Sequence, residues 1–297
     1  MLGFHVNKTI SKGGRKKTRD MATAMKTDIG VVRNWGFAKP AAQIFVTGPR
    51  DFHKSITPED ATAIRRIVED EAVVVIHGAY VDNPWSLSPG AVHNIKQEMI
   101  IAHEIGATGV IVHLAAGASS YDSLGQVLHD IATLPDAVKA SATLWLEIHT
   151  AKSSPATYET VEKITRLFER IGVLGLNGLR VGLCIDTAHL FACGMALDTY
   201  DKAKNWIAGL PRVPIMMHLN DSESSLGSGI DKHERLCCGY LWGEYHPDDG
   251  ILPFATSGLA YLLEWAESNN IVTILERDYD GADEDLALIH RMGYFQN

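Results

Sequence analysis

Eight short apolar segments, rich in β-branched residues, recur along the whole length of this 297-residue chain. Longer stretches with helical spacing of apolar residues separate most of them. Alternating strands and helices favour a parallel sheet, and eight such units in one chain predict the α/β class and a closed (β/α)8 TIM barrel. An open, doubly wound sheet is the structural alternative. The predicted strands are Leu2–Val6, Ala42–Val46, Ala72–Ile76, Thr108–Val112, Thr143–Leu146, Val181–Ile185, Pro214–Met217 and Ile271–Leu275.

The helical stretches support the same architecture. Two of them open with a hydroxyl residue followed by proline, Thr57-Pro58 and Ser88-Pro89, which is typical of a helix start. No linker rich in Gly, Ser or Pro divides the chain, so we expect residues 1–297 to form a single domain. The predicted helices include residues 57–70, 90–106, 123–140, 157–171, 199–210 and 257–269.

Six successive predicted strands end at a residue that can bind a metal ion. In a barrel these ends converge on the face where active sites are built, so residues far apart in the sequence would meet. Imidazole and carboxylate ligands suit Zn²⁺, Mn²⁺ or Fe²⁺. For one such residue alone, a loop cap or a simple hydrogen bond is the alternative interpretation, but the recurrence predicts a metal site. The six residues are His77, His113, Glu147, Asp186, His218 and Glu276.

Three further residues are candidates for the same site. His189 follows Asp186 by three residues, so both side chains face one centre if the chain turns into a helix there. Asp231 and His233 are two residues apart, which points both side chains the same way in an extended segment. Nine ligands are too many for one tetrahedral ion, but they suit a cluster of three in which a carboxylate bridges two ions.

Charge and composition restrict the possible partners. The chain has 27 basic and 36 acidic residues, a formal charge of −9, which by itself argues against nucleic acid. Basic residues are nevertheless concentrated near the start of the chain, and the formal charge counts the 13 histidines as neutral. Four cysteines without a C-x-x-C pair exclude a zinc ribbon or a disulfide scaffold. Because no long apolar segment occurs, we expect an intracellular protein, cytoplasmic or, in a eukaryote, nuclear, that is neither secreted nor in a membrane.

Two stretches carry a specific family resemblance. Residues 184–194 read CIDTAHLFACG, and residues 218–233 read HLNDSESSLGSGIDKH. Both closely resemble the signature stretches of the endonuclease IV family of apurinic/apyrimidinic (AP) endonucleases. Similar matches occur at residues 3–6, 43–50, 77–80 and 275–276, so the resemblance runs along the chain.

The resemblance implies a trinuclear zinc site at the C-terminal face of the strands, with Mn possible at one or more positions. By the family pattern His77, His113 and Glu147 hold one zinc, and Glu147 bridges to a second. That second ion is also held by Asp186, His218 and Glu276, and the third by His189, Asp231 and His233. The implied reaction is hydrolysis of DNA 5′ to an abasic site by a zinc-bound hydroxide, leaving a 3′-hydroxyl and a 5′-deoxyribose phosphate. Glu147 would be the catalytic carboxylate.

The substrate implied is double-stranded DNA containing abasic sites, bound by a monomer. The family pattern assigns lesion recognition to Arg50 and Tyr80, although an exposed arginine in a turn and a tyrosine packed as a lid are equally valid interpretations. The basic residues Lys12, Arg15 and Lys16 contact phosphates or belong to a solvated loop. A nuclear-import signal at residues 15–17 is a further interpretation of these basic residues.

Two regions depart from the family pattern. Residues 7–10 read NKTI where the family has a small serine and paired glycines, and the connection 234–250 is longer than usual. The main functional alternative is a divalent-metal-dependent sugar isomerase or epimerase on a similar barrel, which would not need His189, Asp231 and His233. A catalytically silent nucleic-acid-binding barrel would have a broken ligand set, and this set is complete.

Overall fold

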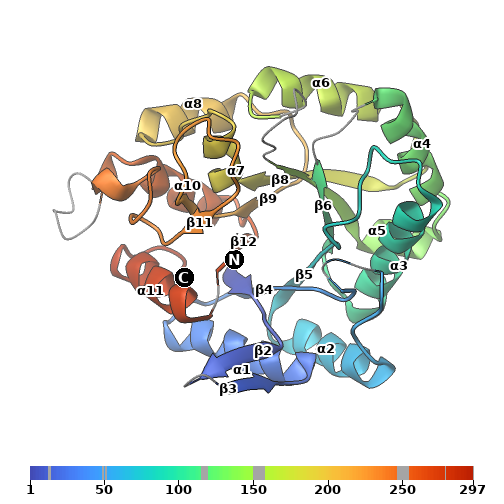
Figure 1. Cartoon of the computed structure of the whole chain (residues 1–297), viewed down its shortest axis with the longest axis horizontal. Helices are drawn as coiled ribbons and strands as arrows, with labels where there is room; N and C mark the ends of the chain where they lie inside the picture. Colours follow the sequence, from blue (N-terminus) through green and yellow to red (C-terminus); the bar gives the residue numbers. More distant parts are fainter. Residues whose placement is uncertain are drawn as a thin grey trace.

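The computed structural model describes residues 1–12, 15–48, 50, 52–114, 120–149, 158–245, 254–277 and 279–296. Eight parallel strands form a closed barrel in the order β1-β12-β9-β8-β7-β6-β5-β4 (Figure 1). This closure confirms the predicted TIM barrel and excludes the open sheet. Each barrel strand coincides with a predicted one to within a few residues. The barrel strands are β1 (Leu2–His5), β4 (Pro40–Ile44), β5 (Val73–His77), β6 (Gly109–Leu114), β7 (Thr143–Ile148), β8 (Arg180–Asp186), β9 (Ile215–His218) and β12 (Thr273–Leu275).

Apolar side chains fill the inside of the barrel. Because side chains alternate across a strand, every second residue points inward. Trp145 is the largest of these inward residues, and its ring lies against Gly182, where a Cβ atom would collide with the ring. This packed interior is a floor beneath the C-terminal ends of the strands. It consists of Ala41, Val75, Ile111, Trp145, Cys184, Met216 and Ile274.

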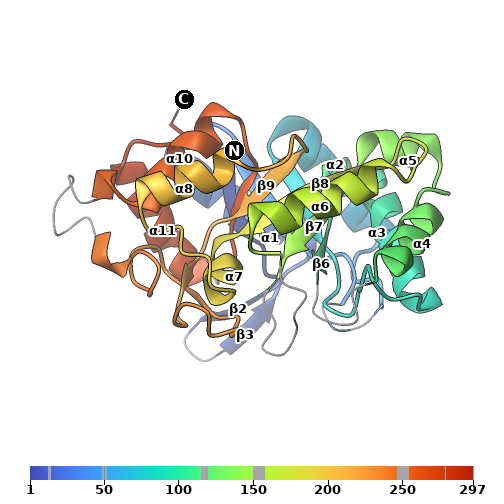
Figure 2. The same ribbon diagram turned by 90° about the horizontal axis from the view of Figure 1, so that it is seen from above.

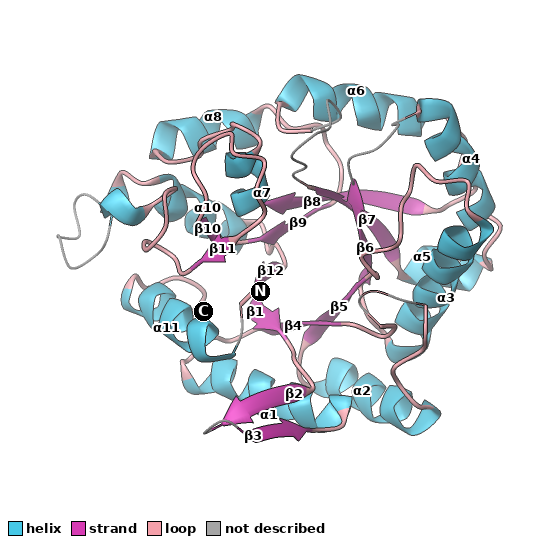
Figure 3. Cartoon of the chain, in the orientation of Figure 1, coloured by secondary structure: helices cyan, strands magenta, loops and turns pink. Residues whose placement is uncertain are grey.

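A ring of helices surrounds the strands (Figure 3). Thr57 caps α2 as expected, since its side chain accepts the Asp60 N–H, whereas Ser88 makes no such bond at the start of α3. The single helix predicted over residues 123–140 is wrong: two helices form, and Pro135 precedes the second because proline cannot donate the bond that would continue the first. The helices are α1 (Met21–Asn34), α2 (Pro58–Asp70), α3 (Pro89–Ile105), α4 (Tyr121–Ile131), α5 (Asp136–Ser141), α6 (Val161–Gly172), α7 (Thr187–Ala192), α8 (Tyr200–Ala208), α10 (Gly258–Ser268) and α11 (Tyr279–Arg291).

The basic segment near the start of the chain forms a β-hairpin, so its interpretation as a loop is wrong. Strands β2 (Thr9–Lys12) and β3 (Arg15–Thr18) pair in antiparallel register. The Lys8 Nζ donates to the Ser55 carbonyl at 2.5 Å and fixes the base of the hairpin. Figure 2 shows the hairpin on the same side of the barrel as helix α7, which follows the C-terminal end of β8. The basic hairpin therefore lies at the face where the strand ends converge.

The long connection 234–250 is anchored by a buried carboxylate over the part that the structure describes. Asp221 of the two-residue strand β10 (Asp221–Ser222) accepts hydrogen bonds from the backbone N–H groups of Gly239, Leu241 and Trp242 at 2.9–3.3 Å. This strand pairs with β11 (His233–Glu234), and the connection continues to a short 3₁₀ helix, η1 (Gly243–Tyr245). Residues 246–250 lie outside the described residues. Among the helices described, none has both the length and the apolar character needed to cross a bilayer.

Candidate metal centre at the ends of the strands

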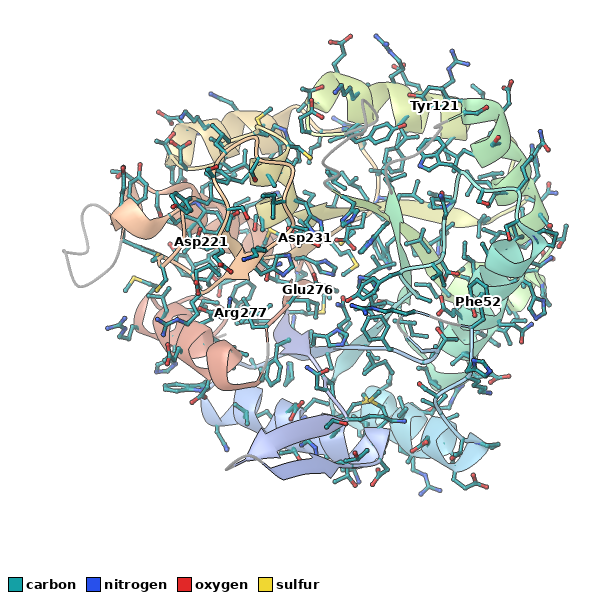
Figure 4. All side chains as sticks on the ribbon, viewed as in Figure 1. Phe52, Tyr121, Asp221, Asp231, Glu276 and Arg277 are labelled. Carbon is teal, nitrogen blue, oxygen red and sulfur yellow. The ribbon has the colours of Figure 1, made fainter. Side chains whose placement is uncertain are left out.

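The predicted metal-binding residues lie at the C-terminal ends of their strands. His77, Asp186 and His218 are the last residues of β5, β8 and β9. The parallel register sets His113 beside Glu147, and Asp186 beside His218. In Figure 4 the labelled Asp231 and Glu276 lie over the middle of the barrel, whereas Phe52 and Tyr121 lie toward its rim. The strand-end prediction therefore describes one cluster in space.

His77, His113 and Glu147 form the first ligand group. The Nε2 atoms of the two histidines are 3.2 Å apart, and they lie 3.6 and 3.3 Å from Glu147 Oε2. A tetrahedral zinc ion with ligands at about 2.0–2.1 Å separates them by roughly 3.3 Å. These three side chains therefore have the spacing that a bound zinc ion requires.

The second group is centred on His218. Its Nδ1 lies 3.4 Å from Glu147 Oε1, 3.3 Å from Glu276 Oε2 and 3.8 Å from Asp186 Oδ2. Glu147 thus presents one oxygen to the first group and the other to the second. A carboxylate in this position is suited to bridge two ions.

The third group is built by a helix start and a loop. Asp186 Oδ1 accepts the His189 N–H at 2.8 Å, which begins α7 and turns the His189 ring toward the barrel axis. Asp231 Oδ1 then lies 3.2 Å from His189 Nε2 and 3.3 Å from His233 Nε2. These two separations also fit a metal position, and all nine predicted ligands belong to one of the three groups.

The second ring nitrogen of several histidines is bound to a protein oxygen. Such a bond fixes the ring tautomer and leaves the other nitrogen for a metal ion. In each case the bonded nitrogen is the one that points away from the ligand group. The bonds join His77 Nδ1 to Gly78 O at 2.7 Å, His189 Nδ1 to Ile148 O at 3.0 Å, His233 Nδ1 to Glu276 O at 3.3 Å, and His218 Nε2 to Gln43 Oε1 at 2.8 Å.

The atoms that face the metal positions are buried and lack ordinary hydrogen bonds. Within the described residues, both carboxylate oxygens of Glu147 and the inward nitrogens of His189, His218 and His233 have no hydrogen-bond partner. Leaving such groups unsatisfied costs about 1–3 kcal/mol each, so a protein retains them where another partner is available. A cluster of divalent cations satisfies all of them, and the donor set therefore fits the metal ions that the fold implies.

Electrostatics keep the central carboxylates ionised. Burial alone would raise the pKa of Glu147, but His113, His218 and His189 lower it well below its usual range. Burial likewise opposes ionisation of Glu276, and His218 outweighs it and lowers the pKa of this carboxyl to about 2. Both groups are therefore carboxylates, the form that binds a cation, across the physiological pH range.

Two amide side chains that the sequence did not single out hold these ligands. Gln43 of β4 accepts from His218 and donates to Glu276 Oε1 at 2.5 Å. Asn220 donates to Asp186 Oδ2 at 2.9 Å and accepts the Glu276 N–H at 2.9 Å. Both amides are buried, so their hydrogen bonds fix the orientation of the second ligand group.

His149 was also missed. It follows Glu147 by two residues, and its ring stacks on His113 with 4.2 Å between centroids. The sequence offered a signal, because a spacing of two at the end of a strand places both side chains on one face. One ligand was expected at each strand end, and at the end of β7 that ligand is Glu147.

An open cavity of about 660 Å³ adjoins the ligand groups. Its lining includes the two residues predicted to recognise the lesion, Arg50 and Tyr80, together with Arg277, which was not predicted. The Tyr80 side chain is half exposed, and its ring contacts those of His77 and His113. Lys12, Arg15 and Lys16 lie in the hairpin strands, and their side chains fall outside the part of the structure that is described.

The fold and the site define a metal-binding TIM barrel, and comparisons with known proteins agree. Residues 31–256 match the family described as xylose isomerase-like TIM barrel. A protein of African swine fever virus (isolate Tick/Malawi/Lil 20-1/1983) named "Probable AP endonuclease" is 33% identical over 287 residues, which cover 94% of this chain and 92% of the viral one.

Two further comparisons place the chain more narrowly. "Endonuclease 4" of Thermus thermophilus is 29% identical over 220 residues, covering 68% of this chain and 73% of that protein. The solved structure of AsfvAP:AG superposes with a TM-score of 0.82 at 30% identity, over 98% of this chain and 96% of that one. The chain belongs to the endonuclease IV family of AP endonucleases.

Proposed function

We propose that this protein is a DNA-repair endonuclease that hydrolyses the phosphodiester bond 5′ to an abasic site, leaving a 3′-hydroxyl and a 5′-deoxyribose phosphate. The observation that carries the proposal is the set of three ligand groups, two of them joined through Glu147, beside an open cavity. Relatives named AP endonuclease and endonuclease 4 support the same substrate class. The protein acts on double-stranded DNA as a single-domain, intracellular monomer.

The cofactor in this proposal is three zinc ions, with manganese able to occupy one or more positions. His77, His113 and Glu147 hold the first ion, and Glu147 with Asp186, His218 and Glu276 holds the second. The third group, formed by His189, Asp231 and His233, holds the last. When bound, such ions lower the pKa of water and polarise a phosphoryl oxygen.

The chain's own residues position the substrate and the ions. Glu147 is fully buried and its two oxygens face different ligand groups, so it fixes the separation of the first two positions. Asp231 is 45% exposed in its side chain and therefore faces the cavity in which a phosphate would lie. Arg50 lines the larger cavity of about 660 Å³, where it contributes a positive charge. Tyr80 offers an exposed ring beside the ligands, which suits contact with an extruded abasic nucleotide.

The third ligand group distinguishes this function from the sugar isomerase or epimerase alternative. An isomerase barrel needs one or two divalent ions, and the first two groups would supply them. His189 Nε2, His233 Nε2 and Asp231 Oδ1 would then have no purpose, although they lie at ligand spacing from one another. This third group favours phosphodiester chemistry, in which a further cation offsets phosphate charge.

The test is cleavage of a duplex that carries one tetrahydrofuran abasic analogue. Zinc-replete protein should cut 5′ to the analogue, and a strong chelator should abolish cutting. Glu147→Gln should fold but lose more than about 4 kcal/mol of transition-state stabilisation, roughly a thousand-fold in rate. Glu169→Gln, the same substitution at an exposed position of α6, is the matched control.

Two results would contradict the proposal. Zinc-replete protein that leaves the duplex intact is one, and near-wild-type cleavage by Glu147→Gln in metal-defined buffer is the other. Metal analysis separates the alternatives as well: about three zinc ions per chain support the nuclease, whereas one or two manganese or magnesium ions support the isomerase.

A further inference from the structure

The His149 ring lies between the first and third ligand groups. Strand β7 ends at Ile148, and His149 continues the inward face on which Glu147 lies. Its ring stacks on His113 with 4.2 Å between centroids and 15° between planes, and it meets the His189 ring edge-on at 4.6 Å. The family pattern assigns this position no role, yet its ring is part of the wall of a cavity of about 250 Å³ beside the ligands.

The backbone holds this ring in place. The carbonyl of Ile148 is bonded to His189 Nδ1 at 3.0 Å, and the carbonyl of His149 accepts from Cys193 Sγ at 3.9 Å. Both bonds tie the end of β7 to helix α7 and the turn that follows it. The rings of His149 and His189 are therefore carried by one connected unit.

The chemistry of the ring nitrogens points to a cation. One ligand atom each from His149, His189 and Asp231 lies within 4.8 Å of the other two. His149 Nδ1 is buried and has no hydrogen-bond partner in the described part of the chain. A buried imidazole nitrogen without a partner is unfavourable, and coordination of a metal ion removes that penalty. Asp231 is 45% exposed in its side chain, so it has room to move inward by the small distance that coordination requires.

We propose that His149 is a fourth protein ligand at the metal position of His189, Asp231 and His233. The inference rests on the proposed metal-dependent function and adds a ligand to one of its three positions. Zinc sites with four protein ligands are closed and hold the ion firmly, whereas sites with three keep a position open. The second position already has four protein ligands, so the third ion should be released as slowly as the second, and both should be released more slowly than the first.

The test measures release of zinc from the loaded full-length protein. A chromogenic chelator in excess should release three ions per chain from the wild type, one in a fast phase and two in a slow phase. His149→Phe keeps an aromatic ring on His113 but has no nitrogen, and it should accelerate release of one of the two slow ions at least about 10-fold. His149→Ala should do the same, and added imidazole should restore slow release by filling the space. His129→Ala, at an exposed position of α4, should release zinc as the wild type does.

Each outcome supports or overturns the proposal that His149 is a metal ligand. Wild-type release kinetics in His149→Phe would overturn the inference, and so would a wild-type protein that holds only two ions. If His149→Phe loses all its ions through misfolding, His149→Ala decides: imidazole rescue supports the inference, and failure of rescue refutes it. A wild type that holds three ions but does not cut the tetrahydrofuran duplex refutes the proposed function and leaves the role of His149 standing.

Discussion

Replacing Gln43 tests how the second ligand group is held. Gln43 is fully buried in β4, accepts from His218 Nε2 at 2.8 Å and donates to Glu276 Oε1 at 2.5 Å. These bonds fix His218 in the tautomer whose Nδ1 faces the metal position, and they hold Glu276 beside it. Gln43→Met keeps the length and approximate volume of the side chain but removes both bonds, together with the contact of Gln43 Nε2 with His5 Nδ1 at 3.1 Å.

The structure sets the size of the effect. Loss of Gln43 leaves one buried N–H and one carboxylate oxygen without their partner, and each unsatisfied group costs about 1–3 kcal/mol. Part of this penalty applies to both the metal-free and the zinc-bound protein, so that part cancels in the free energy of zinc binding. We therefore expect zinc affinity at the second position to fall by about 10–100-fold, which corresponds to about 1.4–2.8 kcal/mol. Cleavage should fall in parallel at limiting zinc and recover at saturating zinc.

The assay is competitive titration of the metal-free protein with zinc in the presence of a chromogenic chelator. Gln126→Met, on the exposed face of α4, is the control and should match the wild type. If Gln43→Met binds every ion with wild-type affinity, the side chain does not orient His218 and the reasoning fails. If its activity stays low at saturating zinc, Gln43 acts on the reaction itself rather than through metal affinity.

The remaining predictions concern three other residues. Asn220→Ala frees the Glu276 N–H and Asp186 Oδ2, so zinc titration should show a 10–100-fold weaker second position. Arg50→Ala should weaken binding of abasic duplex and lower the salt dependence of binding by about one ion, with unchanged zinc content, in fluorescence anisotropy. Burial raises the pKa of Asp285 from 3.8 to about 7, so folding stability should fall as pH rises between these values. Asp285→Asn, which keeps an acceptor for the Leu236 N–H, should be more stable than wild type at pH 8 by at most about 4 kcal/mol and equal to it near pH 3.5 in urea unfolding.

Strand periodicity and strand ends were sufficient to predict most of the architecture. A parallel strand buried on both faces is a nearly continuous apolar run, so a polar residue at its end is conspicuous. His77, His113 and Asp186 each follow such a run, and parallel pairing brings them to one face. The prediction that His189 faces the same centre as Asp186 required the chain to turn into a helix at that point. Helix α7 begins there, with Asp186 as its N-cap.

The supporting residues could not be found in this way. Gln43 lies inside an apolar strand, and its partners His218 and Glu276 are 175 and 233 residues away in the sequence. A buried amide has no sequence signature of its own, since its role exists only after the barrel closes. The hairpin of residues 9–18 was hidden for a different reason: the segment is rich in basic residues, as a solvated loop is, and its sequence has no alternating apolar pattern to indicate a strand.

The site and the core of this barrel are separate layers, which explains how it carries buried groups without hydrogen bonds. Below the ligands, Trp145 and its neighbours fill the interior with apolar contacts that do not depend on any ion. Above them, Glu147 has both oxygens unsatisfied in a position that is fully buried. Glutamine has almost the same volume as glutamate and leaves the apolar layer intact, so Glu147→Gln should keep the fold while disabling the site. The apolar barrel interior and the surrounding helices therefore supply the stability of the fold, and the arrangement of the ligands can serve metal binding alone.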